Sequence, residues 1–189
     1  MRAGVRTAWS CSTGRYAAHA IVIYSDDHGN NWTMGALLPA YTGEPAMAEL
    51  ANGSVLMTFR CEQGRGSMEH VRGFARSDDG GATWAQIWYL DECCPRVIDA
   101  PSQQAIDRST KTGYLYFGHP GEVTGDRANY TIHRSANDGL TWDYVGVIYP
   151  KGAGYSDIHV LPHEGRPRRP SRRRISAHAV RPQIGGWRI

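Results

Sequence analysis

The apolar residues of this chain fall into short runs separated by polar turns, which is the pattern of an all-β protein. No stretch makes a convincing helix, and no apolar run reaches the roughly 18 residues of a membrane-spanning helix. The runs instead suggest about four strands for each repeating unit. The predicted strands are residues 20–24, 32–38, 44–50, 54–60, 71–75, 84–90, 102–106, 114–117, 127–134, 142–149 and 155–161.

An eight-residue polar pattern follows a strand-like run three times, and each copy ends in tryptophan. The copies are residues 25–32 (SDDHGNNW), 77–84 (SDDGGATW) and 135–142 (SANDGLTW), and their starts lie 52 and 58 residues apart. Asp or Asn at the third position is expected to accept a hydrogen bond from the backbone N–H two residues on. Gly at the fifth position can take a positive φ. The pattern therefore predicts three hairpin turns at the spacing of propeller blades, each anchored by a tryptophan.

This pattern, S-x-D-x-G-x-T-W, resembles the Asp box, or BNR repeat, of sialidases. The first copy has Asn31 where Thr is usual, and the third has Asn137 where Asp is usual. The resemblance implies an all-β partial β-propeller with four-stranded antiparallel blades, about three blades of a six-bladed ring. Family sialidases keep the box away from the active site, and other propellers carry it too. The box therefore indicates the fold rather than the function.

Three further segments resemble the parts of sialidases that carry chemistry. They are residues 44–60 (EPAMAELANGSVLMTFR), residues 117–131 (FGHPGEVTGDRANYT) and residues 154–158 (GYSDI). The resemblance covers roughly residues 18–162 and is greatest to the lysosomal-type animal sialidases and their bacterial relatives. A lone tyrosine or arginine in a β protein more often belongs to the core or to a solvated face. The order box, Glu, Arg, box, Arg, box, Tyr makes this likeness specific.

The resemblance implies roles for four residues. Sialic acid carries a carboxylate on its anomeric carbon, which Arg60 and Arg127 would bind because guanidinium groups match carboxylates bidentately. Tyr155 corresponds to the nucleophile, since a carboxylate nucleophile would be repelled by the substrate's own charge. A free phenol has a pKa of about 10, so it needs a base, and Glu44 is the candidate. We expect Glu44 within hydrogen-bond reach of the Tyr155 hydroxyl, with both arginines facing the same concavity and favouring the phenolate.

Two elements of the family site have no counterpart in the sequence. Family sialidases place a first arginine, in an Arg-Ile-Pro motif, and an Asp acid/base upstream of the region that begins here, and nothing before Ser25 resembles them. Asp26 and Asp27 belong to the first box. Glu49 is an alternative acid whose place in a hairpin indicates a solvated carboxylate, and we do not include Asp157 in the site. The chain is therefore expected to be an incomplete catalytic domain.

The formal net charge of +3 combines two different kinds of sequence. Residues 1–162 carry a net charge of −4, whereas residues 163–189 carry +7 from eight arginines and one glutamate. Pro167 and Pro170 cannot donate to a β ladder. We therefore expect a partial propeller domain over residues 1–162 and a disordered Arg-rich tail over residues 163–189, derived from a change of reading frame or of splice site just after Pro162. A basic arm for nucleic acid or an anionic membrane is the functional alternative for the tail.

The resemblance implies an exo-α-sialidase, a retaining hydrolase that releases terminal α-linked sialic acids from glycoproteins, oligosaccharides or gangliosides. No cofactor or metal is expected, and the expected partners are sialylated glycoconjugates rather than nucleic acid. The family suggests the lysosome or the secretory pathway, although no signal peptide is visible. The four cysteines show no CxxC spacing and leave free thiols and one disulfide equally open. Two other readings are a non-catalytic Asp-box propeller that binds glycans or proteins, and a truncated product without activity.

Overall fold

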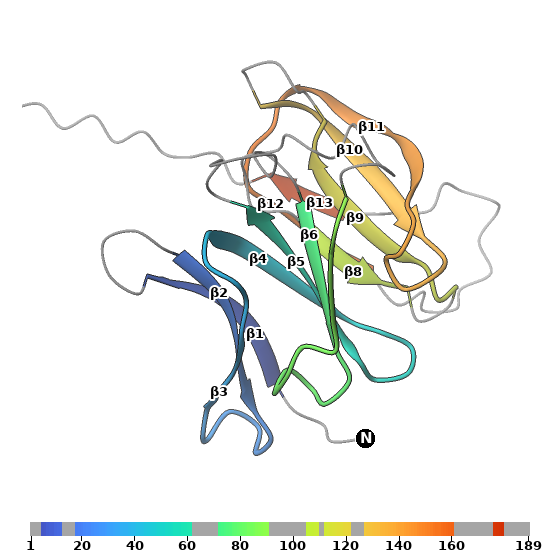
Figure 1. The fold of residues 1–189 in the computed structure, drawn as a ribbon. Helices are drawn as coiled ribbons and strands as arrows, with labels where there is room; N and C mark the ends of the chain where they lie inside the picture. Colours follow the sequence, from blue (N-terminus) through green and yellow to red (C-terminus); the bar gives the residue numbers. More distant parts are fainter. Residues whose placement is uncertain are drawn as a thin grey trace, which may run out of the picture.

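A computed structural model gives the fold of the chain, and the part that it describes is built from β-strands (Figure 1). None of the described residues is in a helix, and therefore none forms a helix that could cross a membrane. The all-β prediction is confirmed. The described residues are 5–12, 18–61, 72–90, 105–109, 112–121, 127–160 and 176–179.

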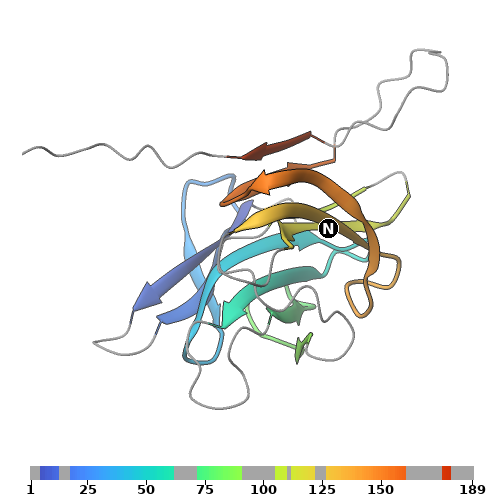
Figure 2. The ribbon, with the colours of Figure 1, turned by 90° about the horizontal axis from the view of Figure 1, so that it is seen from above.

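The strands form four antiparallel sheets, A to D, which follow one another along the chain (Figures 1 and 2). The first strands of neighbouring sheets lie side by side, because β4 contacts β8 and β8 contacts β12. Sheet A contains β1 (Val5–Ser12), β2 (Ala18–Ser25) and β3 (Thr33–Leu37); sheet B contains β4 (Thr42–Glu49), β5 (Val55–Cys61), β6 (Arg72–Ser77) and β7 (Gln86–Tyr89); sheet C contains β8 (Ala105–Arg108), β9 (Leu115–Pro120), β10 (Ala128–Ser135) and β11 (Asp143–Gly152); sheet D contains β12 (Ser156–His159) and β13 (Ser176–Ala179).

Each box is the turn between the last two strands of its sheet, as predicted. In the second box, Gly81 N donates to Ser77 Oγ (2.7 Å), and Ser77 Oγ donates to Asp79 Oδ1 (2.8 Å). Asp79 also accepts from Thr83 N (2.9 Å), and the first and third boxes repeat all three bonds. The predicted acceptor position was wrong, because the carboxylate binds the N–H four residues on. Both Gly80 (φ 79°) and Gly81 (φ 102°) take positive φ, so the backbone curls around the carboxylate.

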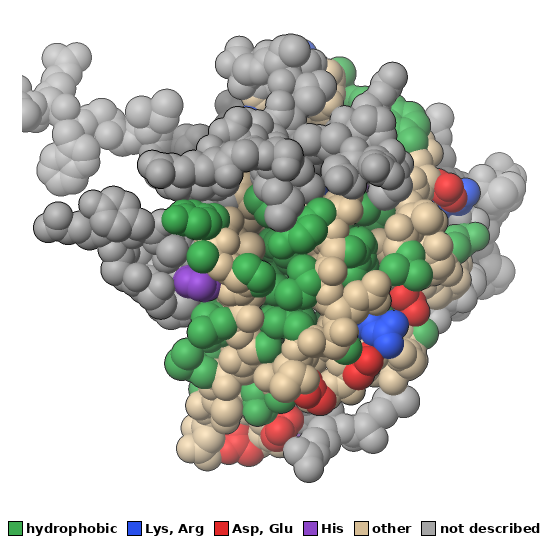
Figure 3. Space-filling model, viewed as in Figure 1, with side chains coloured by type: hydrophobic (Ala, Val, Ile, Leu, Met, Phe, Trp, Pro, Cys, Tyr) green, Lys and Arg blue, Asp and Glu red, His purple; other side chains and the backbone are tan. Residues whose placement is uncertain are grey.

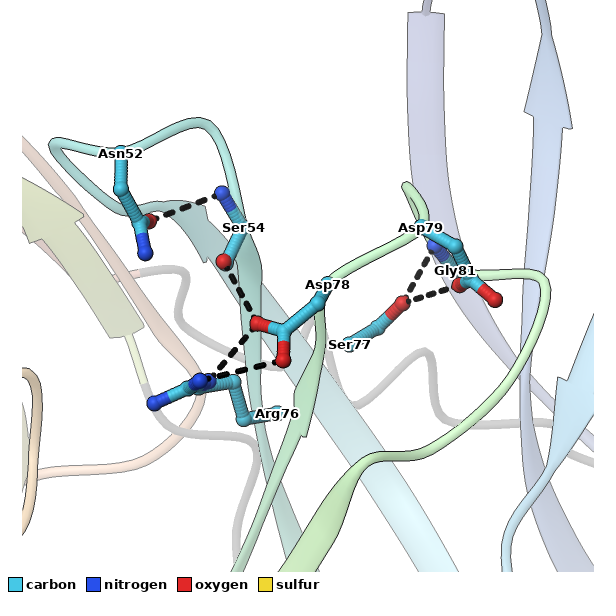
Figure 4. Close-up of polar contacts among 7 residues, drawn as sticks. All are labelled: Asn52, Ser54, Arg76, Ser77, Asp78, Asp79 and Gly81. Atoms are coloured by element: carbon cyan, nitrogen blue, oxygen red, sulfur yellow. Dashed lines mark hydrogen bonds and ion pairs between the residues drawn. The ribbon is translucent and has the colours of Figure 1, made fainter.

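Asp78, the other carboxylate of the second box, joins this box to the neighbouring β4–β5 hairpin of sheet B (Figure 4). Asp78 accepts from Ser54 Oγ (2.7 Å) and from two nitrogens of Arg76 (2.8 and 3.0 Å). Ser54 lies in the β4–β5 turn, where its N–H donates to Asn52 Oδ1 (3.0 Å). Gly53 takes a positive φ of 86° in this turn, as the Asn-Gly pair predicts. Asp78 thus holds the two turns at this end of sheet B together.

The second and third boxes also pack against the sheet that precedes them. Gly81 O accepts from Ala36 N of sheet A (2.8 Å), and a Cβ added at Gly81 would lie 2.6 Å from Val22 Cγ1. A Cβ added at Gly139 would lie 2.8 Å from Leu56 Cδ2 of sheet B. Glycine is therefore needed at the fifth box position both for its positive φ and for the close approach of the neighbouring sheet.

The three box tryptophans differ in burial. Trp142 is 8% exposed, and its ring centroid lies 5.5 Å from that of Phe74 and 5.3 Å from that of Phe117, so it packs between sheets B and C. Trp84 is half-buried against the core shared by sheets A and B. Trp32 is 48% exposed, so the prediction that a tryptophan anchors each turn by its burial is wrong for the first copy. No sheet precedes sheet A among the described residues to cover it.

The surface reflects this layered arrangement. Apolar side chains form a central band on the face shown in Figure 3. Acidic side chains lie along the lower edge, where the turns β2–β3 and β6–β7 lie in Figure 1. The carboxylates of the first two boxes therefore lie on a polar rim below the apolar band.

Two parts of the chain differ from the sequence prediction. No strand was predicted before residue 18, yet β1 pairs with β2 along its whole length. The tail was predicted to be disordered throughout residues 163–189, yet residues 176–179 pair with β12 as β13. This short stretch lacks proline and arginine, so its backbone can join the ladder that β12 leaves open. Residues 163–175 and 180–189 lie outside the described residues.

Candidate active site

The structure places Glu44 on a distorted part of β4. The pairing of β4 with β5 shifts between Gly43 and Ala46, which marks a β-bulge at Glu44. Glu44 also has a φ of 43°, a conformation that non-glycine residues seldom adopt and that costs about 1 kcal/mol or more. A bulge re-aims the side chain that it carries. Glu44 is half-buried and turned toward residues of other strands.

The Glu44 carboxylate contacts two of the predicted site residues, one with each oxygen. Tyr155 Oη donates to Glu44 Oε1 at 2.7 Å, although the two residues are 111 positions apart. Arg60 Nη1 lies 3.3 Å from Glu44 Oε2, which makes an ion pair and a hydrogen bond. Tyr155 lies directly before β12 and is 45% exposed, so its ring is open to a ligand. The expected contact between the carboxylate and the phenol is present.

Arg127 completes the group from sheet C. Its guanidinium carbon lies 5.5 Å from the centre of the Tyr155 ring, within the range of a cation–π contact. The backbone holds both residues in place, because Arg127 O accepts from Ala153 N (2.7 Å), two residues before Tyr155. The four residues Glu44, Arg60, Arg127 and Tyr155 are therefore brought together from sheets B and C and from the entry to sheet D.

The electrostatics of Tyr155 differ from the sequence expectation. The hydrogen bond to Glu44, together with partial burial and the charge of that carboxylate, raises the pKa of Tyr155 above its usual value of 10.0. Arg127 lowers the pKa of Tyr155, as expected, but the effect of Glu44 is larger. The contact with Glu44 therefore favours the protonated phenol. Only a transfer of its proton to Glu44 would remove the negative charge that opposes the phenolate.

A third arginine lies beside this group and was not predicted. Arg72 stands opposite Arg60 in the β5–β6 ladder and is 2% exposed. Burial lowers its pKa to about 9, and the charge of Glu44 opposes that shift. The neighbouring Cys61 is a half-buried free thiol whose pKa is raised by burial. The sequence shows an arginine at the start of a strand, but only the strand register places it next to Glu44.

The residues set aside in the sequence lie apart from this group. Glu49 is exposed at the end of β4, and its backbone oxygen accepts from Arg108 Nε (2.7 Å). Asp157 is exposed and accepts from the backbone N–H of Ile158 (2.9 Å). Among the residues that the structure describes, no three His, Cys, Asp or Glu side chains are grouped to hold a metal ion. The cationic group around Tyr155 is suited to an anion instead.

Comparisons with known proteins identify the family of the chain. Residues 5–165 match the family model described as the BNR repeat-like domain. The sialidase of Micromonospora viridifaciens is 30% identical over 151 residues, which cover 77% of this chain and 22% of that protein. The sialidase of Vibrio cholerae is 30% identical over 175 residues, which cover 79% of this chain and 22% of that protein.

Solved structures show the same fold. The Trypanosoma rangeli sialidase in complex with the inhibitor DANA has a TM-score of 0.66 at 19% identity, over 83% of this chain and 26% of that one. The Hadza microbial sialidase Hz136 has a TM-score of 0.62 at 22% identity, over 75% of this chain and 27% of that one. The chain spans about a fifth of the length of the curated relatives cited above. It belongs to the sialidase family of BNR-repeat proteins, and its sheets form part of a sialidase-type propeller.

Proposed function

We propose that this chain is the part of an exo-α-sialidase that carries the nucleophile, its base and two carboxylate-binding arginines. Its substrates are terminal α-linked sialic acids of glycoproteins, oligosaccharides or gangliosides. The observation that carries the proposal is the 2.7 Å hydrogen bond from Tyr155 to Glu44, in contact with Arg60 and Arg127. A tyrosine paired with a base beside two guanidinium groups matches a sugar that carries its own carboxylate.

In the proposed reaction, Tyr155 gives its proton to Glu44 as its oxygen attacks the anomeric carbon. The bond from that carbon to the leaving oxygen breaks, the leaving oxygen takes a proton from an acid/base residue that another part of the sialidase would supply, and the sugar becomes attached to the phenolic oxygen with inversion. Water then replaces the tyrosine with a second inversion and gives its proton to the same acid/base residue, while Glu44 returns the first proton to the phenol, so the overall reaction is retaining. Arg127 stabilises the developing phenolate, because its charge already lowers the pKa of Tyr155. Arg60 orients the base through its ion pair with Glu44.

The proposal is tested with 2,3-difluorosialic acid, the compound named with a covalent intermediate in a Trypanosoma rangeli sialidase structure. Fluoride departs without a proton, so the reagent does not require the acid/base residue that the sequence does not show. We expect intact-protein mass spectrometry to detect one added sugar and peptide mapping to place it on Tyr155. Tyr155→Phe should abolish the adduct, and Glu44→Gln should slow it about 10²-fold or more.

Turnover gives a second readout. The chain alone is expected to hydrolyse a fluorogenic sialoside negligibly, because no upstream arginine or acid is visible in its sequence. An adduct that persists in Tyr155→Phe would contradict the assigned nucleophile. Measurable hydrolysis that Tyr155→Phe abolishes would uphold the enzyme and show that the site of this chain is complete.

A further inference from the structure

A pocket opens on the outer half of sheet C, which is formed by β10 and β11 (Figure 1). Its volume is about 100 Å³, whereas a single water molecule needs only about 10–15 Å³. No residue of the candidate active site is among the described residues that line it. Those lining residues are Gly121, Asn129, Thr131, His133, Tyr144 and Val147.

An irregular ladder shapes this part of the sheet. Thr131 pairs with Val147, and His133 pairs with Tyr144, so a step of two residues on β10 faces a step of three on β11. This mismatch is a β-bulge, which bends a strand and re-aims its side chains. Directly paired residues point to the same face of a sheet. The four side chains therefore share the face on which the pocket lies.

His133 is the buried polar group of the pocket. It is 4% exposed, and neither of its ring nitrogens has a hydrogen-bond partner among the described residues. Its ring stacks on that of His119, which lies 5.3 Å from Phe117 in the core between sheets B and C. Burial lowers the pKa of His133 to about 4, so the ring is neutral near pH 7 and carries one donor and one acceptor. Buried polar groups normally have partners, and a ligand in the pocket would supply one.

The other polar wall of the pocket is held in place by hydrogen bonds. Thr131 is 4% exposed, and its hydroxyl donates to Asn129 O at 2.7 Å. The Thr131 oxygen is therefore oriented to accept from a ligand. Gly121 N donates to the same carbonyl at 2.8 Å, and a Cβ added at Gly121 would collide with Thr131 Oγ1. Glycine at this position thus keeps the hydroxyl where it is.

The remaining wall is apolar and open. Tyr144 is 57% exposed, and its ring stands edge-on to that of His133 at 5.7 Å. Val147 is also exposed. None of the described lining residues carries a charge near pH 7, so the pocket suits a neutral ligand with hydroxyl groups and one apolar face. A pyranose fits this description, because its hydroxyls lie along the rim of the ring and galactose gathers several C–H groups on one face.

We propose that this pocket is a second sugar site, which binds a neutral pyranose such as galactose. A hydroxyl of the sugar binds a ring nitrogen of His133, another donates to Thr131 Oγ1, and the C–H face packs on the ring of Tyr144. This binding needs neither the nucleophile nor a carboxylate on the sugar, so it goes beyond the proposed function. The same ring chemistry is present in a separate neutral glycan and in the neutral part of a sialylated one.

Nuclear magnetic resonance titration of the full chain with methyl β-galactoside at pH 7 tests the proposal. We expect a Kd of about 1 mM, as is typical of a ligand of this size, with shifts of the His133 ring nitrogens. Tyr144→Ala should raise the Kd at least about 10-fold, because the stacking ring is lost. Tyr149→Ala is the matched control, since Tyr149 is 45% exposed on the same strand but does not line the pocket. It should keep the wild-type Kd.

Two further variants separate this proposal from the proposed function. His133→Phe keeps the size of the ring without its nitrogens and should also raise the Kd at least about 10-fold. Tyr155→Phe should bind methyl β-galactoside as the wild type does, even though it abolishes the covalent adduct. No binding up to about 50 mM, or a Kd that is unchanged in Tyr144→Ala, would overturn the second sugar site.

Titration with 3′-sialyllactose distinguishes the two sources of the sugar. An affinity that falls in Tyr144→Ala assigns the pocket to the neutral part of a sialylated glycan. An affinity for 3′-sialyllactose that is equal in Tyr144→Ala and the wild type, beside a weakened affinity for methyl β-galactoside, assigns the pocket to a separate neutral glycan.

Discussion

We predict that the protein loses stability when the pH falls from 8 to 5, because two buried histidines must stay neutral. His119 on β9 and His133 on β10 stack with ring centroids 5.1 Å apart and are 0% and 4% exposed. Burial lowers the pKa of His119 to about 3, with further lowering by the charges of His133 and Arg72. Burial also lowers the pKa of His133 to about 4.

The sign follows from which state binds protons. A histidine in the unfolded chain has a pKa of about 6.5, so below that pH the unfolded state takes up a proton that the folded state does not. The contribution to stability is full above pH 6.5 and is lost as the pH falls toward the folded-state pKa values of about 4 and about 3. A pH of 5 lies about 1.5 units below the unfolded-state pKa, and each unit corresponds to about 1.4 kcal/mol, so each histidine loses roughly 2 kcal/mol of stabilisation. The two histidines together should therefore lower the free energy of unfolding by roughly 4 kcal/mol between pH 8 and pH 5.

Urea denaturation at pH 8 and pH 5, followed by tryptophan fluorescence, measures this difference. His133→Phe removes one of the two groups and should reduce the pH-dependent loss by about 2 kcal/mol. The control His28→Asn changes an exposed histidine of the first box, where asparagine tolerates the φ of 60°, and should keep the wild-type loss. A free energy of unfolding that is equal at the two pH values, or an undiminished loss in His133→Phe, would refute the reasoning.

Two further predictions concern the box turns. Gly81→Ala should lower the free energy of unfolding by roughly 3 kcal/mol, because alanine meets both a φ of 102° and Val22 at 2.6 Å. Gly53→Ala, at a φ of 86° with open space around it, should cost only about 1 kcal/mol, and equal losses in urea denaturation would contradict the close packing. Trp142→Ala should cost about 3–5 kcal/mol. Trp32→Ala should lower the free energy of unfolding by only about 1 kcal/mol, because Trp32 is 48% exposed, and similar losses for the two variants would contradict this difference in burial.

The sequence predicts most of the fold because its strongest signals are local. The three boxes and the Asn-Gly turn each contain the residues that close their own hairpin, so the pattern alone places the strands on either side. The strands β1 and β13 have no such turn chemistry in their favour. They form because an edge of β2 and an edge of β12 are available for pairing, which depends on tertiary structure and not on local pattern.

The site was predicted by its resemblance to a family and not from local pattern. Glu44 and Tyr155 meet across 111 positions, and nothing local to either residue indicates the other. The sign of the Tyr155 pKa shift could not be predicted, because it depends on whether Glu44 or Arg127 acts on the phenol more strongly. Arg72 was missed for a similar reason, since its place opposite Arg60 depends on strand register.

The strand register also explains how the same type of sheet can carry a box turn and site residues, because the two lie at opposite ends of its strands. In sheet B, Arg60 pairs with Gly43 on one side and with Arg72 on the other, so these residues share one end of the strands with Glu44. Ser77, where the box begins, pairs with Val55 at the opposite end of the same strands.

Sheet C follows the same rule, because Arg127 precedes the start of β10 and Ser135 at its end opens the third box. The hydrogen bonds of the boxes thus fix the alignment of the strands at one end, and the pairing register then determines which residues lie side by side at the other end. A substitution in a box should therefore change stability before it changes the Glu44–Tyr155 contact. The separation lets the box sequence recur three times while the residues at the other end differ from sheet to sheet.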